Sequence, residues 1–295
     1  MPDHSVRIMS SDGFLRASAA VTTDLTRAIC RLQGCDPTAS IALARLVVGA
    51  ALLGSQLKGD QRLALQIEGN GPLQRLQAES DAGGHLRASV KNPLCGLPPK
   101  DGRFDVAGAI GRAGFLHVVK DLGLKEPYRG MVQLQSSEIG EDLAWYLLTS
   151  EQIPSTVAVG AVLDPAGEVA AAGGLLVQAM PGADPSLVPL LEERLLSLPP
   201  ISTSLRDGHT PIGLLDRLFA GIPYGEQGQR QALSFRCGCS RAQAGRILLT
   251  LGREELQELA GKAEGTVVTC EYCRATYGFD GAALAALAAG PGTGN

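Results

Sequence analysis

The chain has 295 residues, a length typical of two domains of ordinary size. Apolar residues make up 45% and charged residues 19%, which is enough apolar material for packed cores and excludes a disordered chain. The charge balance of 26 basic against 30 acidic residues gives −4, without the basic excess that proteins bound to nucleic acid usually carry.

No apolar run reaches the roughly 20 residues that a membrane-spanning helix needs. The longest candidate, 41–53, is interrupted by Arg45. The N-terminus also lacks the basic start and the apolar block of a secretory signal. We therefore expect a cytoplasmic protein whose thiols stay reduced.

Residues 1–181 predict an N-terminal α+β core domain. Strand-like 14–21 precedes a helix over 23–32 and a second helix over 38–53, which is apolar around most of its circumference and is therefore expected to be buried. Runs of strands with separately grouped helices favour antiparallel sheets with packed helices. Alternating patterns and Gly turns predict further strands over 63–67, 73–78, 86–90, 115–120, 131–135, 157–163 and 175–178, with a helix over 139–148.

A Pro- and Gly-rich boundary at 181–185 introduces a predicted helical linker over 182–231. One helix carries leucines on a single face, and a second begins with Thr210 as N-cap and Pro211 at the first helical position. Both helices are too short to be stable alone, so their apolar faces need a surface to cover.

Residues 232–295 predict a small C-terminal module. Ser240 begins a capping-box pattern, and we expect the helix behind it to bury Ile247, Leu248 and Leu251 and to end at Gly252. Two strands, 266–269 and 275–279, flank a pair of cysteines, and 291–295 is expected to be a loose tail.

The strongest chemical signal is a set of four cysteines within a window of 37 residues. Cys237-Gly238-Cys239 is separated by 30 residues from Cys270-Glu271-Tyr272-Cys273. Four thiolates suit tetrahedral zinc, and the absence of any histidine after His209 argues against a mixed Cys/His site in this module. The pattern predicts a four-thiolate zinc site.

On spacing alone, a permanent structural zinc site is the commoner explanation, because a module of about 58 residues has little core. The C-x-C pair favours a redox-active zinc site over a purely structural one, since neighbouring thiolates can close into a strained, easily reduced disulfide. Metal binding supplies roughly 10–16 kcal/mol in zinc-finger peptides, whereas whole domains are stable by only ~5–15 kcal/mol. Oxidation that expels the ion should therefore unfold the module.

At these residues the chain resembles the redox-regulated chaperones called heat shock protein 33. The resemblance includes 235–240, the spacing of 30 residues, and Cys270 to Cys273 followed by Tyr277 and Phe279. It extends over nearly the whole chain, through further motifs at 69–73, 130–134, 141–146, 150–152 and 172–182.

The resemblance implies a non-enzymatic, ATP-independent holdase that binds unfolding client proteins. One zinc ion held by Cys237, Cys239, Cys270 and Cys273 would keep the reduced protein inactive. Oxidation would form Cys237–Cys239 and Cys270–Cys273 disulfides, release zinc, unfold the module and the linker, and allow homodimers to form. The sequence contains no G-x-x-x-x-G-K-[ST] nucleotide-binding loop, in agreement with a chaperone that does not use ATP.

Two other functions are weighed against this one. A zinc-ribbon protein that binds nucleic acid is disfavoured because 232–295 holds six basic and six acidic residues, and would be negative with four thiolates around zinc. A thiol-disulfide oxidoreductase usually places C-x-x-C at the start of a helix, whereas strand-like residues lie on both sides of Cys270 and Cys273.

The remaining thiols and histidines predict no further site. Cys30 falls on a helix and Cys35 in the loop after it, so ordinary core or loop roles are favoured over a redox pair. Cys95 lies in a predicted loop, and Glu151 is expected to make a structural contact. No pair of histidines has metal-ligand spacing, and the four lie at positions 4, 85, 117 and 209.

Overall fold

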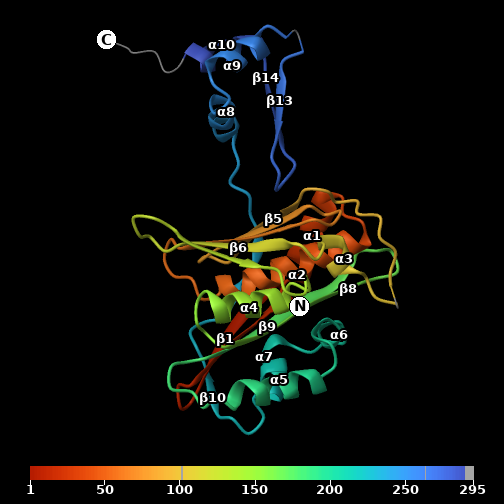
Figure 1. Ribbon diagram of the computed structural model, residues 1–295, viewed down its shortest axis with the longest axis vertical. Helices are drawn as coiled ribbons and strands as arrows, with labels where there is room; N and C mark the ends of the chain where they lie inside the picture. The colour runs from red at the N-terminus through yellow and green to blue at the C-terminus, as the bar shows by residue number, and fades with distance from the viewer. Residues whose placement is uncertain (101, 263, 290–295) are drawn as a thin grey trace. The chain divides into compact units, whose positions relative to one another are not determined.

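The computed structural model describes residues 1–100, 102–262 and 264–289, and the chain folds into two units, Met1–Arg236 and Cys237–Asn295 (Figure 1). The predicted α+β class, with antiparallel sheets, packed helices and a C-terminal four-cysteine cluster, is confirmed.

The first sheet of the larger unit has the strand order β10-β1-β2-β9-β8, and all its pairings are antiparallel. β1 and β2 form a hairpin whose β2 pairs with the long strand β9, so residues near the N-terminus lie in the middle of this sheet. A short strand, β11, also pairs with the outer edge of β1. The bounds are β1 (His4–Ser10), β2 (Leu15–Val21), β8 (Ser155–Leu163), β9 (Val169–Ala179), β10 (Tyr224–Glu226) and β11 (Gln231–Ala232).

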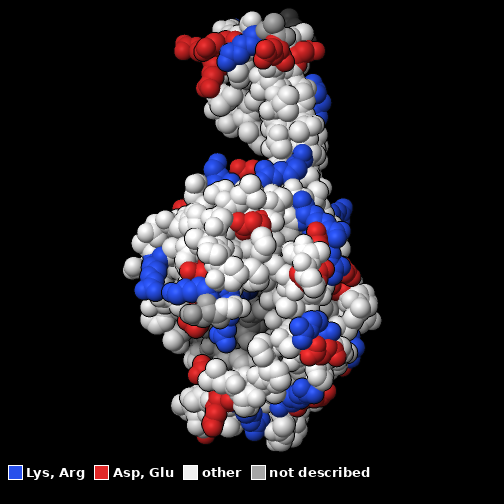
Figure 2. All heavy atoms as spheres, turned by 90° about the vertical axis from the view of Figure 1, so that its right-hand side faces the viewer, with Lys and Arg blue, Asp and Glu red and all other residues white. Residues whose placement is uncertain are grey.

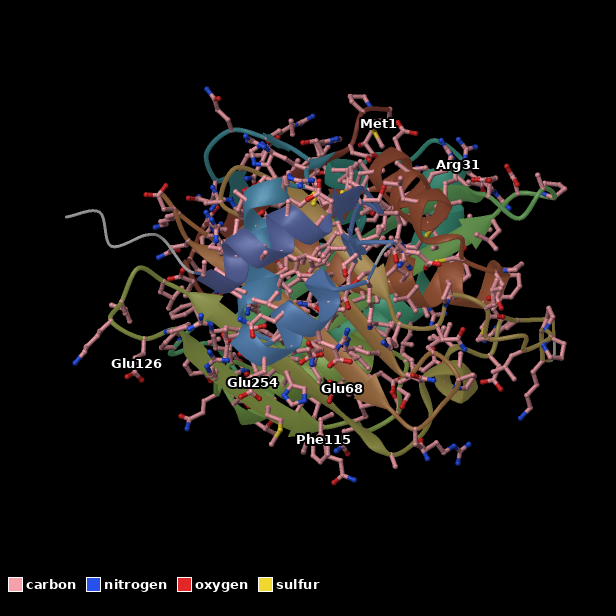
Figure 3. All side chains as sticks on the ribbon, turned by 90° about the horizontal axis from the view of Figure 1, so that it is seen from above. Met1, Arg31, Glu68, Phe115, Glu126 and Glu254 are labelled. Atoms are coloured by element: carbon pink, nitrogen blue, oxygen red, sulfur yellow. The ribbon has the colours of Figure 1, made fainter. Side chains whose placement is uncertain are left out.

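The second sheet has the order β12-β5-β4-β3-β6-β7, with antiparallel pairings except between β12 and β5, which run parallel. Its strands alternate as predicted: Leu63, Leu65 and Ile67 of β3 are buried, while the residues between them face outward. Glu68 and Phe115 are cross-strand neighbours on the outer face (Figure 3). The bounds are β3 (Arg62–Gly69), β4 (Arg75–Asp81), β5 (His85–Val90), β6 (Gly114–Asp121), β7 (Tyr128–Gln133) and β12 (Ser234–Phe235).

The main core lies between these two sheets, around the helix α2 (Pro37–Gly54) (Figure 1). The Asp36 carboxylate caps this helix by accepting a hydrogen bond from the Ala39 N–H at 2.8 Å. In the described part of the chain, α2 alone is long and apolar enough to cross a membrane, but 89% of that stretch is buried, as in a core helix. The neighbouring helices are α1 (Thr23–Gln33), α3 (Val106–Ile110) and α4 (Gly140–Thr149).

Three short helices cover the opposite face of the first sheet and form a second apolar cluster. Leu191, Leu205 and Leu215 project from them onto apolar residues of the sheet such as Val6 and Ile8. The predicted helices with a leucine face and with Thr210 as N-cap are both present, and the Thr210 hydroxyl accepts a hydrogen bond from the Gly213 N–H. The bounds are α5 (Leu187–Ser197), α6 (Ile201–Arg206) and α7 (Pro211–Leu218).

The smaller unit packs three helices against a two-stranded sheet. Its fully buried apolar set within the described residues is small and consists of Ala244, Leu248, Leu256, Phe279 and Leu284. The bounds are α8 (Arg241–Leu249), α9 (Arg253–Ala260), β13 (Thr266–Thr269), β14 (Thr276–Phe279) and α10 (Gly281–Ala289).

Two details predicted for α8 are wrong. The helix is capped at Thr250, and Gly252 instead has a φ of 90° as the N-cap of α9. Leu248 is buried as predicted, but Ile247 is 61% and Leu251 42% exposed. Ala244, four residues before Leu248, shares its buried side, because β14 and α10 cover that face of α8. The tail predicted at 291–295 lies outside the described residues.

Leu215→Ala should destabilise the larger unit by about 2–5 kcal/mol, because Leu215 is fully buried between α7 and the first sheet. Leu196→Ala is the matched control, since Leu196 on α5 is 86% exposed and its truncation should cost less than about 0.5 kcal/mol. Urea unfolding of the reduced protein, followed by fluorescence of Trp145, measures both. Equal stabilities for the two variants would contradict this packing.

Candidate metal centre

The C-x-C motif lies where an extended segment turns into a helix. Cys237, Gly238 and Cys239 follow β12 and precede α8. The Ser240 hydroxyl caps α8 by accepting a hydrogen bond from the Gln243 N–H at 3.2 Å, as the capping pattern predicts. This cap fixes the chain immediately after Cys239.

The C-x-x-C motif forms the tight turn between β13 and β14, which pair in antiparallel register. The Cys270 N–H donates to the Ala275 carbonyl at 2.8 Å, and the Arg274 N–H donates to the Cys270 carbonyl at 3.0 Å. Arg274 has a φ of 60°, which lets the chain reverse within this short loop. The turn directs Cys270 and Cys273 to the same side.

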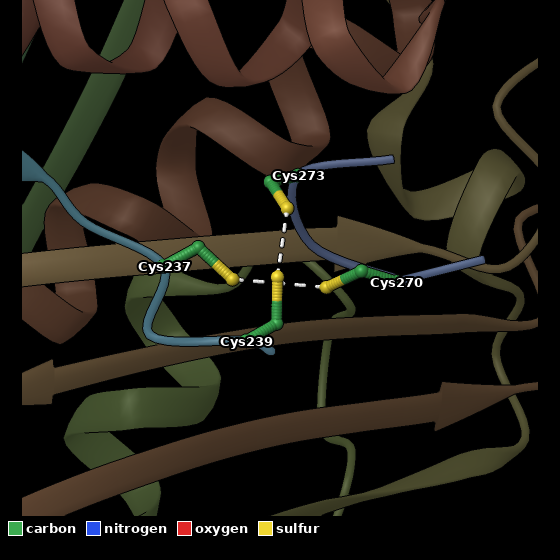
Figure 4. A group of neighbouring side chains, drawn as sticks. All are labelled: Cys237, Cys239, Cys270 and Cys273. Carbon is green, nitrogen blue, oxygen red and sulfur yellow. Dashed lines mark hydrogen bonds between the residues drawn. The ribbon is translucent and has the colours of Figure 1, made fainter. Parts of the chain in front are cut away.

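All four thiols converge on one point (Figure 4), and their sulfur atoms lie within 4.8 Å of one another. The Cys237 and Cys270 sulfurs are 3.7 Å apart, and the Cys239 and Cys273 sulfurs are 3.3 Å apart. A zinc ion with four Zn–S bonds of ~2.3 Å places its sulfurs about 3.8 Å apart in a tetrahedron. The donor set and its spacing therefore fit one zinc ion.

Arg241 joins the two motifs from the first turn of α8. Its guanidinium donates to the Gly278 carbonyl on β14 and lies 4.4 Å from the centre of the Phe279 ring. Because Tyr277 and Phe279 are two residues apart on β14, they lie on the same face of that strand. Arg241 therefore holds the start of α8, and with it Cys239, beside the strand that follows Cys273.

The environment separates the acidities of the thiols. The Tyr277 hydroxyl, 3.1 Å from the Cys239 sulfur, stabilises the thiolate and lowers the pKa of Cys239 to about 7. Burial and then hydrogen bonds with the other thiols raise the pKa of Cys273 to about 12. Burial also raises the pKa of Cys237. In the metal-free protein Cys239 is thus more acidic than Cys237 or Cys273.

The other candidate residues do not join this site. Cys30 is buried in the main core, and Cys35 and Cys95 pack against it from loops. The Cys95 thiol donates to the Asp36 carboxylate at 3.4 Å. Glu151 makes the structural contact expected of it, accepting a hydrogen bond from the Tyr146 hydroxyl at 2.7 Å and pairing with Lys120.

The geometry also bears on the two competing functions. Cys270 and Cys273 lie between two strands rather than at a helix N-terminus, where thiol oxidoreductases place this motif. On the face of the molecule in Figure 2, basic and acidic side chains are interspersed on the smaller unit, without a continuous basic surface. The first observation counts against a thiol-disulfide oxidoreductase, and the second against a zinc-ribbon protein that binds nucleic acid.

Fold and site together define an α+β protein with a C-terminal four-thiol metal centre. The family model described as "Hsp33 protein" matches residues 3–280. The 33 kDa chaperonin of Syntrophotalea carbinolica is 61% identical over 289 residues, covering 98% of this chain and 100% of that protein. The 33 kDa chaperonin of Geobacter sulfurreducens is 50% identical over 277 residues, which cover 94% of this chain and 92% of that protein.

A solved structure agrees with these sequence matches. The crystal structure of the 33 kDa chaperonin (heat shock protein 33 homolog) from Thermotoga maritima superposes with a TM-score of 0.86 at 34% identity, covering 97% of this chain and 98% of that one. The chain belongs to the Hsp33 family. It is a redox-regulated chaperone with a four-cysteine zinc site, a non-enzymatic holdase whose partners are unfolded client proteins.

Tyr277→Phe should weaken zinc binding about tenfold at pH 7, because an outer-shell hydrogen bond to a ligand is lost. Without the hydroxyl, the pKa of Cys239 moves from about 7 back toward its ordinary value of 9.0. At pH 7 the Cys239 thiol of the variant is then mostly protonated, whereas that of the wild type is about half ionised, so zinc has to displace more proton in the variant. The difference in zinc affinity between the variant and the wild type should shrink above about pH 9, where the Cys239 thiol ionises in both proteins.

Competition with a colorimetric chelator from pH 6 to 9.5, roughly the range in which thiols titrate, measures this effect. Tyr128→Phe is the matched control, since that hydroxyl donates to the Ser150 carbonyl in the larger unit. Identical zinc affinities for Tyr277→Phe and the wild type across this range would show that the hydroxyl does not tune the site.

Proposed function

We propose that oxidation of the four clustered thiols switches this protein from an inactive form to an ATP-independent holdase. In the reduced form, Cys237, Cys239, Cys270 and Cys273 hold one zinc ion. The observation that carries the proposal is the convergence of these sulfurs within 4.8 Å in a unit that has little other core. We expect the protein to work in the cytoplasm, where the thiols are reduced in the absence of stress.

The smaller unit depends on this cross-link for its stability. When bound, the ion joins the two cysteine motifs and supplies binding energy of roughly 10–16 kcal/mol, as in zinc-finger peptides. The buried apolar set of the described part of the unit is only five residues, and a single core in so small a module rarely supplies more than about 3–5 kcal/mol. Loss of the thiolate ligands should therefore unfold the unit.

The oxidation step balances with hydrogen peroxide as the oxidant. Each peroxide molecule takes two electrons from a pair of thiolates: its O–O bond breaks, one S–S bond forms, and two protons are taken up to give two molecules of water. Two peroxide molecules thus convert four thiolates into two disulfides and remove all four anionic ligands. The first thiolate attacks the peroxide to give a sulfenic acid. The second thiolate then attacks the sulfenic sulfur, so that the S–S bond forms, the S–O bond breaks and the hydroxyl group leaves as water.

We assign the disulfides to Cys237–Cys239 and Cys270–Cys273, within each motif. The hydrogen-bonded sulfur pairs, in contrast, join the two motifs. Disulfides between the motifs would keep the unit cross-linked, whereas disulfides within them free the two motifs from each other. Partners two or three residues apart also stay close once the unit has opened, which favours local closure.

Unfolding then reaches the linker through the chain itself. We divide the protein functionally into a core domain, 1–181, a helical linker, 182–231, and the redox module, 232–295. The linker helices are short and cover one apolar face of the first sheet. When they detach, that face becomes available to unfolded clients and to a second copy of the protein, so homodimers are expected on activation.

Peroxide at mildly elevated temperature should release zinc and switch on suppression of client aggregation with the same time course. The physical reason is that both events require conversion of the same thiolates to disulfides. A zinc-sensitive dye and light scattering of an aggregating client follow them in parallel, and peptide mapping should find Cys237–Cys239 and Cys270–Cys273. Equally strong suppression with all thiols reduced and zinc bound would refute the switch.

Cys270→Ser should lower zinc affinity by at least about 100-fold, because a hydroxyl does not replace a thiolate ligand. The variant should also be cleaved faster within 182–231 under limited proteolysis, with no oxidant present. Cys95→Ser is the matched control, since Cys95 lies in a loop of the larger unit. Unchanged cleavage of the linker in Cys270→Ser would separate zinc binding from linker stability.

A further inference from the structure

We propose that the outer edge of β1 is where the activated chaperone binds clients, by adding an extended apolar client segment to the first sheet as a new strand. The proposal deepens the function above and rests on detachment of the linker. The client-binding element is then a strand edge with an adjoining apolar face. It would recognise an extended client segment by its main chain and by apolar side chains at alternate positions.

In the structure, the linker's own extended segment occupies this edge. β10 pairs antiparallel with β1, with Ile8 opposite Glu226 and Ser10 opposite Tyr224, and β11 continues along the same edge beside His4 and Ser5. The Gln227 N–H donates to the Arg7 carbonyl at 2.7 Å, and the Ser11 N–H donates to the Pro223 carbonyl at 2.8 Å. An extended polypeptide therefore fits the edge.

Alternation along β1 defines which main-chain groups form the edge. The carbonyls of Asp3 and Arg7 and the N–H of Ser11 point toward the linker, so Ser5 and Met9 share that direction. Val6 and Ile8 lie at the intervening positions, and their main-chain groups pair with β2. Removal of the linker segment would leave these outward-pointing main-chain groups without partners, while the pairing of β1 with β2 stays intact.

The present occupant is joined to β1 by main-chain hydrogen bonds, and two side-chain hydrogen bonds, from Tyr224 to Asp216 and from Gln231 to the Ala82 carbonyl, hold it from other elements. Gly225, Glu226 and Ala232 are exposed, and Gln231 is half-buried. Leu233, the residue after β11, is the buried apolar anchor of this stretch, and its N–H donates to the Asp3 carbonyl at 3.0 Å. Segments with few buried contacts open at low free energy. This one ends a few residues before Cys237, so loss of the zinc ligands acts directly on it.

The edge adjoins the apolar face that the linker helices cover. Val6 and Ile8 belong to the apolar cluster beneath α5, α6 and α7. Tyr224 shows how an added strand uses this face: its ring packs edge-on against Phe219, with centroids 5.7 Å apart. Once the helices leave, a client strand could pair its main chain with β1. If every second side chain of that strand is apolar, those side chains would lie on this face.

Amide hydrogen exchange, resolved by residue in the full-length protein, tests the proposal. The outward amides of Met9 and Ser11 should exchange about tenfold faster or more after oxidation, because their partners on the linker segment have left. Adding reduced, carboxymethylated α-lactalbumin, a permanently unfolded protein without free thiols, should slow them about tenfold or more again. The amides of Val6 and Ile8 are internal controls and should stay protected throughout.

Client aggregation assays on the same samples separate this proposal from the function on which it rests. If the oxidised protein suppresses aggregation but the outward amides stay fast with client bound, the strand-edge site is refuted and the holdase function stands. If those amides remain protected after oxidation, the linker has not left the edge and the proposal also fails. If the oxidised protein holds no client at all, both fail.

Met9→Pro removes one outward N–H, and proline is tolerated at the outer edge of a sheet because the pairing on the inner side does not need that donor. Met9→Ala truncates the same side chain but keeps the N–H. Activated Met9→Pro should bind the unfolded probe about tenfold more weakly than activated Met9→Ala, because the main-chain hydrogen bond is absent. Equal affinities for the two variants, both with unchanged β1–β2 exchange protection, would overturn the proposal.

Discussion

The convergence of four cysteine sulfurs within 4.8 Å is the constraint on which the smaller unit depends. Two turns of different kinds, one leading into a helix and one between two strands, have to meet for those sulfurs to share an ion. Arg241 and Tyr277 show how the protein brings this about: the first ties the start of α8 to β14, and the second donates a hydrogen bond to Cys239. Little apolar burial supports the arrangement, so in the proposed function the stability of the unit follows the charge and oxidation state of the thiols.

The larger unit has two apolar layers that are built differently. Nearly all of α2, a long helix with a carboxylate cap, is buried between the two sheets. The layer beneath α5, α6 and α7 is built from short helices, and α5 buries only Leu191 completely. Because helices of this length are not stable by themselves, the outer layer can be lost while the inner layer stays. In the proposed function, this difference turns a local thiol oxidation into exposure of a large apolar surface.

Sequence reasoning was least successful where long-range pairing decides the structure. Strands β10, β11 and β12 are two or three residues long and have no clear period, and they form only because β1 and β5 offer free edges. The wrong assignment of Ile247 and Leu251 to a buried face has a similar cause: a helix with apolar residues on two sides buries the side that β14 and α10 cover. Gly252 was expected to end α8, but the positive φ that glycine permits is used to begin α9.

Local sequence patterns were sufficient to predict the elements with a strong period and the chemistry that depends on residue type. These are the buried helix α2, the alternating strands of the second sheet, the α+β class, and a C-terminal pair of cysteine motifs suited to zinc, because periodicity and ligand type are local properties. Three features follow instead from how the chain folds: the contacts between sulfurs of the two motifs, the effect of Tyr277 on the acidity of Cys239, and the pairing of the linker with the edge of β1. Each of these requires residues far apart in the chain to meet, and neither propensity nor spacing specifies such distances.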